Sequence, residues 1–100
     1  MRLYTSESQT AKLIELGFSE PKSIECCYDN GYDLDYAYSI GELIEMLPKE
    51  FDGELLEIAP VTLSYAKWMV RYPYGIIVYK NELIDALYDM VVNLKEDGVI

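Results

Sequence analysis

The chain of 100 residues contains no histidine, which removes several kinds of active site. Without histidine, its two cysteines cannot form a Cys-His nucleophile pair, and a mixed Cys/His metal site is excluded. There is also no glycine-rich phosphate loop, and no serine stands in a nucleophile elbow. The sequence therefore predicts no catalytic residues, no metal site and no cofactor, and we expect the protein not to be an enzyme.

Basic residues are scarce. The chain has 8 Lys and Arg against 18 Asp and Glu, which gives a formal net charge of −10. Lys and Arg supply most of the affinity for nucleic acid and anionic membranes, so neither is expected as a direct partner. An acidic surface is compatible with simple solubility, with a basic partner, or with imitation of a polyanion.

Long apolar runs and a disulfide framework are missing too. No stretch approaches the roughly 20 apolar residues that cross a bilayer, and the polar first residues do not resemble a signal peptide. Cys26 and Cys27 are adjacent, and such a pair does not indicate a disulfide-stabilised fold. These features predict a cytoplasmic protein.

The composition includes 51% hydrophobic residues and ten tyrosines against two phenylalanines. The hydrophobic fraction predicts one folded domain over residues 1–100. Tyrosine suits positions where the ring packs and the hydroxyl reaches water or a partner, and ten hydroxyls cannot all be buried in so small a core. The predicted interaction surface consists of Tyr28, Tyr32, Tyr36, Tyr74 and Tyr79. Ordinary packing at the rim of the core explains the same residues equally well.

Three helices are indicated by capping and spacing. Ser6 to Gln9 and Ser39 to Glu42 both fit the capping box, with helix stops at Gly17 and Pro48 respectively. A closing helix is expected to begin at or near Asn81. Its apolar stripe recurs at helical spacing, at Leu83, Leu87, Val91 and Leu94.

Two hairpins are predicted. Residues 24–38 surround Asp29-Asn30-Gly31, where a two-residue turn would pair apolar with acidic positions. We therefore favour a three-residue loop, which places Ile24 and Cys26 with the apolar positions of the return strand. The second hairpin joins residues 67–72 to 76–79, and its first strand carries Trp68, Val70 and Tyr72 on one face.

A further strand is expected over residues 55–63. Pro60 cannot donate to a ladder, so this strand should bulge there or lie at an edge. The predicted fold class is α+β: an antiparallel sheet of four to five strands with two to three helices packed against it, the C-terminal helix being central.

Two acidic clusters have chemical and ordinary interpretations. Asp29, Asn30, Asp33 and Asp35 carry ligands suited to calcium, but their spacing does not match an EF-hand, and a solvated turn explains them. Four glutamates could supply an acid and base pair as in glycoside hydrolysis, but most domains carry this many acids on solvated faces, and 100 residues rarely provide the cleft that such an enzyme needs. These are Glu42, Glu45, Glu54 and Glu57.

The last two-thirds of the chain resembles a group of small uncharacterised bacterial proteins linked to phage-like or mobile elements of gut anaerobes. The resemblance rests on a capped short helix, a strand tryptophan and a closing helix. The residues are Tyr38-Ser39 with Leu43, Leu47 and Pro48, then Trp68, and then residues 85–90 with Leu94. It implies an α+β domain and no known activity.

The leading functional hypothesis is a non-enzymatic protein-interaction or accessory protein with a Tyr-rich surface, with a homo-oligomer as one form of that interaction. The alternative is an acidic mimic of nucleic acid that inhibits a host nucleic-acid-binding protein. A small hydrolase comes third. The sequence does not name a partner.

Overall fold

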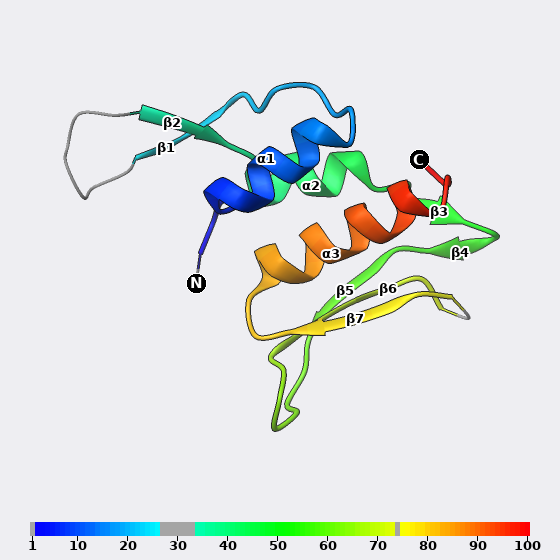
Figure 1. Cartoon of the computed structure of the whole chain (residues 1–100). Coiled ribbons are helices and arrows are strands. Elements are labelled where there is room, and N and C mark those ends of the chain that lie inside the picture. The colour runs from blue at the N-terminus through cyan, green and yellow to red at the C-terminus, as the bar shows by residue number, and fades with distance from the viewer. Residues whose placement is uncertain (1, 27–33, 74) are drawn as a thin grey trace.

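The computed structural model describes residues 2–26, 34–73 and 75–100 and has an α+β fold (Figure 1). The helices are α1 (Glu7–Glu15), α2 (Ile40–Met46) and α3 (Leu83–Glu96). The strands are β1 (Ser23–Cys26), β2 (Leu34–Ala37), β3 (Glu50–Phe51), β4 (Glu54–Leu55), β5 (Glu57–Pro60), β6 (Trp68–Arg71) and β7 (Ile77–Lys80).

Both predicted capping boxes are present. The Ser6 hydroxyl accepts from the Gln9 amide at 3.2 Å, and the Gln9 side chain accepts from the Ser6 amide at 2.9 Å. α1 then ends in the left-handed conformation of Gly17, whose φ is +100°, and the Phe18 amide bonds back to the Leu13 carbonyl. Local hydrogen bonding therefore fixes both ends of this helix.

α3 begins near Asn81, as predicted. Its N-cap is Glu82, and no side chain caps it. The Glu82 carbonyl accepts from the Ala86 amide at 3.1 Å, so the helix begins with backbone bonds alone. The apolar stripe is as predicted, because Leu83, Leu87, Val91 and Leu94 are all buried. Packing, with no side-chain cap, holds this helix in place.

The first hairpin has the predicted register. Ile24 pairs with Tyr36 and Cys26 with Leu34, which is the pairing of a three-residue loop. The loop itself, Asp29-Asn30-Gly31, lies outside the described residues.

The second hairpin belongs to a three-stranded antiparallel sheet of order β5-β6-β7. Val70 and Tyr72 are fully buried and Trp68 packs against the core, so the predicted inner face of β6 is confirmed. β5 is shorter than residues 55–63, and it lies at an edge of the sheet, as Pro60 requires.

The strands do not form the single sheet of four or five strands that we expected. Among the described residues, β1-β2 and β3-β4 are separate two-stranded ladders. β3 and β4 enclose a tight turn at Asp52 and Gly53, which both have positive φ. The partner then changes along one extended segment: the Leu56 amide bonds to Lys49 on one side, whereas Glu57 pairs with Arg71 on the other. Only long-range packing determines such a change of partner.

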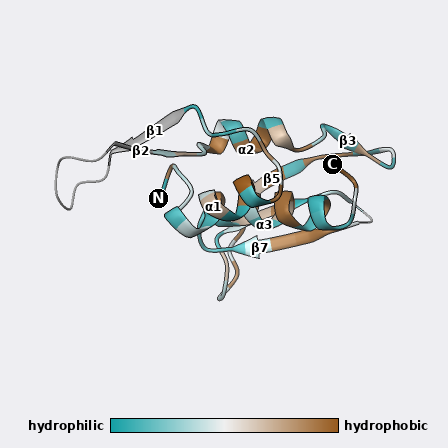
Figure 2. Ribbon diagram, turned by 45° about the horizontal axis from the view of Figure 1, so that its top comes forward, coloured by the Kyte–Doolittle hydropathy of each residue, from teal (hydrophilic) through white to brown (hydrophobic). Residues whose placement is uncertain are grey.

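The core lies between α3 and the inner face of the three-stranded sheet, with α2 packed against α3 (Figure 1). The C-terminal helix is thus central, as predicted. The helices all lie on one side of this sheet, and hydrophobic residues run along β7 on its border (Figure 2). No helix in the described part of the chain is both long and apolar enough to span a membrane.

Candidate functional site

The side of the three-stranded sheet that faces away from α3 is the first candidate. Side chains that pair across antiparallel strands point to the same face. Ala59 pairs with Met69, and Met69 with Tyr79, so these three form a row opposite Val70 and the core. Glu57, Arg71 and Ile77 form the next row. Together with Tyr65, which packs on Tyr79, we call this surface the outer face: Glu57, Ala59, Tyr65, Met69, Arg71, Ile77 and Tyr79.

The outer face exposes large apolar and aromatic side chains. Tyr65 is 66% exposed, Ile77 45% and Tyr79 37%. The rings of Tyr65 and Tyr79 meet edge to face, with centroids 6.3 Å apart. Met69 lies between Ala59 and Tyr79 in its row and is only 8% exposed, although it is not part of the core cluster. Exposed aromatics around a covered methionine are typical of an interface centre.

Charge on the outer face is nearly balanced. The Arg71 Nε donates to Glu57 Oε2 at 2.5 Å, so this cation is already paired. Lys67 is exposed and has no ion-pair partner among the described residues. The surrounding segment, residues 58–81, contains no Asp or Glu although the chain has 18. The outer face is therefore a nearly neutral, aromatic surface on an acidic protein.

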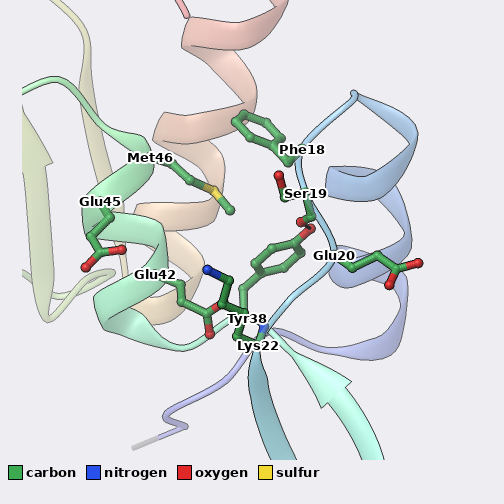
Figure 3. Close-up of a pocket in the computed structure, with 8 residues that line it drawn as sticks. All are labelled: Phe18, Ser19, Glu20, Lys22, Tyr38, Glu42, Glu45 and Met46. Carbon is green, nitrogen blue, oxygen red and sulfur yellow. Dashed lines mark hydrogen bonds between the residues drawn. The ribbon is translucent and has the colours of Figure 1, made fainter.

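A groove between α2 and the segment that follows α1 is the second candidate (Figure 3). It has a volume of about 220 Å³. Its lining residues are Phe18, Ser19, Glu20, Lys22, Tyr38, Glu42, Glu45 and Met46.

Two polar groups of the groove, the Tyr38 hydroxyl and the Glu42 carboxylate, have structural partners. The Tyr38 hydroxyl donates to the Ser19 carbonyl at 2.5 Å, and the two Glu42 carboxylate oxygens accept from the Ser39 and Lys22 amides at 3.1 and 3.0 Å. Burial raises the pKa of Tyr38, and the negative charges of Glu42 and Glu20 raise it further. These groups join the chain after α1 to α2, and we assign them no chemical role.

The structure places the predicted tyrosines as follows. Tyr36 lies on β2 and is 57% exposed, whereas Tyr79 lies on β7 in another sheet, on the opposite side of the helices (Figure 1). Tyr28, Tyr32 and Tyr74 lie outside the described residues. The two described members are thus both exposed, as expected of a surface, but they do not share one patch.

The structure brings two of the four acid and base candidates together: Glu42 and Glu45 both line the groove, and Glu42 also caps α2. Glu57 pairs with Arg71, and Glu54 lines a different hollow beside Phe51. Within the described part of the chain, no group of His, Cys, Asp and Glu could hold a metal ion. Of the four calcium candidates, Asp29, Asn30 and Asp33 lie outside that part, and Asp35 lies on β2.

Sequence reasoning missed Tyr65 as a surface residue. Tyr65 lies in the turn between β5 and β6, where the Leu63 amide bonds to the Ala66 carbonyl at 3.3 Å. Its position next to Ser64, between two strand patterns, was an available signal, because turn residues are usually exposed. Tyr38 and Tyr72, in contrast to Tyr65, are buried, and their hydroxyls donate to backbone carbonyls.

Comparisons of the chain with family models, with curated proteins and with solved structures find no match. The resemblance to proteins of mobile elements therefore stays a prediction.

Proposed function

We propose that this chain is a non-enzymatic interaction protein that binds another protein through the outer face. The observation that carries this proposal is the exposure of Tyr65, Ile77 and Tyr79 over Met69, on the side of the sheet opposite the helices. Tyrosines in a largely apolar setting supply much of the binding energy at protein interfaces. Met69 is covered at the centre of this surface, and protein interfaces have an apolar, well-packed centre of this kind.

Charge favours a protein over nucleic acid as the partner. Arg71 is neutralised by Glu57, which leaves Lys67 as the free cation on this surface among the described residues. Nucleic-acid binding releases counterions in proportion to the number of phosphates contacted, so one cation gives little affinity. A protein surface of mixed or weakly acidic character fits this face better.

Site-specific photocrosslinking tests the proposal inside the source cell. A photoreactive phenylalanine derivative at Tyr65 or Tyr79 is expected to give a discrete crosslinked protein band after irradiation. The same derivative at Tyr36 is the matched control, because the exposure of Tyr36, 57%, lies between those of Tyr79 and Tyr65 and Tyr36 is in another sheet. A band that forms only from Tyr36, or from neither outer-face position, contradicts the proposal.

The acidic mimic remains a second proposed function, because charge is segregated along the chain. Residues outside 58–81 contain all 18 acidic residues but only five of the eight basic ones. Such a surface can occupy the nucleic-acid site of a host protein, and the resemblance to mobile-element proteins fits an inhibitor. Binding of this kind weakens steeply as salt rises, whereas binding through the aromatic outer face does not.

A further inference from the structure

We propose that the free edge of β7 pairs with β7 of a second copy of this chain, so that the sheet continues across a symmetric dimer. This inference uses the backbone edge and does not rest on the proposed partner of the outer face. It starts from a difference between the two edges of the β5-β6-β7 sheet.

The β5 edge is blocked. The Val61 amide bonds to Lys67, so alternate residues of this strand face β6, and the residues between them face outward. On that outward side, the Leu56 amide already bonds to Lys49, and Pro60 has no amide hydrogen to donate. Strand β3 at one end and a proline at the other leave little room for another strand.

The β7 edge is open within the described part of the chain. The carbonyls of Ile76 and Lys80 accept hydrogen bonds from Tyr72 and Lys67, so both face β6. Alternation then directs the backbone amide and carbonyl groups of Ile77 and Tyr79 away from the sheet. Neither proline nor a bulge protects this edge, and β7 pairs only with β6. An open edge of this kind is a template for pairing with another chain.

The edge is complementary to itself. When two β7 strands pair antiparallel about an axis at Val78, Ile77 lies opposite Tyr79 of the other copy, and the two residues exchange both backbone hydrogen bonds. Their side chains then meet on the outer face as a β-branched and aromatic cross-strand pair, a favourable combination. Val78 lies opposite its own copy, and Lys80 lies opposite Ile76. No two like charges stand opposite each other in this register.

Charge around β7 permits the approach of two acidic molecules. The segment 58–81 has no carboxylate, and the nearby carboxylates of α3 are paired: Asp85 with Arg2 at 3.2 Å and Asp89 with Lys80 at 3.1 Å. The net charge of −10 still repels a second copy at long range, so salt should strengthen the association. The dimer would also join two outer faces into one surface.

Sedimentation velocity over a range from low micromolar to millimolar protein tests this proposal. The average mass of the wild-type chain should rise with concentration toward twice 11.5 kDa, and more readily at higher salt. Ile77→Pro removes an outward amide without touching the bonds to β6, and should weaken self-association at least about tenfold. Ile77→Ala is the matched control, because it keeps the amide and should still associate. A wild-type chain that stays monomeric, or an Ile77→Pro variant that associates normally, overturns the proposal.

Hydrogen exchange of single amides decides the case even if Ile77→Pro fails to fold. In the wild-type chain, the amides of Ile77 and Tyr79 should exchange more slowly as protein concentration rises, while the already paired Val78 amide changes less. Exchange of Ile77 and Tyr79 that does not depend on concentration overturns the proposal. Loss of crosslinking from the outer face would leave this result untouched, so the two proposals fail separately.

Discussion

The Tyr72 hydroxyl donates a hydrogen bond of 2.6 Å to the carbonyl oxygen of Pro48. Tyr72 follows β6 in the three-stranded sheet, and Pro48 follows α2, so the bond joins the sheet to the helix layer. The Tyr72 ring is fully buried and meets Phe51 edge to face, with centroids 5.7 Å apart. The hydroxyl is therefore satisfied inside the core, and this tyrosine is a structural residue.

Tyr72→Phe should destabilise the protein by about 1–2 kcal/mol, because the partly buried Pro48 carbonyl loses its hydrogen-bond partner. Urea unfolding followed by circular dichroism measures the loss. Tyr79→Phe is the control and should change the free energy of unfolding by less than about 0.5 kcal/mol, since its ring is on the surface. Equal effects of the two variants would contradict the assignment.

Glu42 should stabilise the fold, and the loss of stability should grow with the number of its hydrogen bonds that a substitution removes. Its carboxylate accepts from the Ser39 and Lys22 amides, so Glu42→Gln, with one acceptor oxygen, should cost about 1 kcal/mol. Glu42→Ala loses both bonds and should cost more. Thermal unfolding of the two variants gives the comparison, with Glu45→Gln, at an exposed residue three positions further along the same helix, as the control. A loss as large for Glu45→Gln would show that helix charge, and not these bonds, matters.

Stability should fall at alkaline pH through the buried tyrosines. Burial raises the pKa of Tyr38 and Tyr72 above the ordinary 10.0, so the unfolded chain loses these protons first. The unfolded state then binds fewer protons, and stability declines as pH rises from about 10 through the raised pKa values. Below pH 10 the contribution is fully present.

The measurement is the urea midpoint across this pH window. The double variant Tyr38→Phe/Tyr72→Phe, which keeps both rings, should show a shallower decline than the wild-type chain. An unchanged slope would mean that other groups cause the alkaline loss.

Trp68→Ala should destabilise the fold by about 2–3 kcal/mol, less than the roughly 3–5 kcal/mol of a fully buried tryptophan. The reason is that Trp68 packs against the core cluster but is only partly buried. Equilibrium unfolding measures this value. Tyr65→Ala, at an aromatic that is 66% exposed, should cost less than about 1 kcal/mol. A Trp68→Ala effect as small as that would mean that the faces of β6 are reversed.

Local chemistry made much of the fold predictable. Ser6 with Gln9 marks the start of α1, and Ser39 with Glu42 marks the start of α2. Each signal lies within four residues of sequence, and both capping boxes are present. The pairing of Ile24 with Tyr36 followed from keeping apolar positions together. Where signals were short in range and agreed with one another, the sequence was sufficient.

Long-range packing explains the differences. After Leu56 the strand stops pairing with Lys49 and pairs with β6. This change depends on contacts between segments far apart in the sequence, which local patterns do not reveal, and so the strands were wrongly placed in one sheet. The outer face was only partly foreseen for the same reason. Tyr79 was among the predicted surface residues, but Tyr65 and Ile77 join it only through the register of three strands.

The most direct test of the account is a quantitative pull-down from nuclease-treated lysate of the source cell, at low and high salt, read by mass spectrometry. The baits are the wild-type chain, a Tyr65→Ser/Tyr79→Ser double variant, and a Tyr36→Ser control in the other sheet. We predict a protein that the wild-type and Tyr36→Ser baits retain at high salt and the double variant loses. Capture that the double variant keeps, or that occurs only at low salt with a nucleic-acid-binding protein, would contradict binding through the outer face.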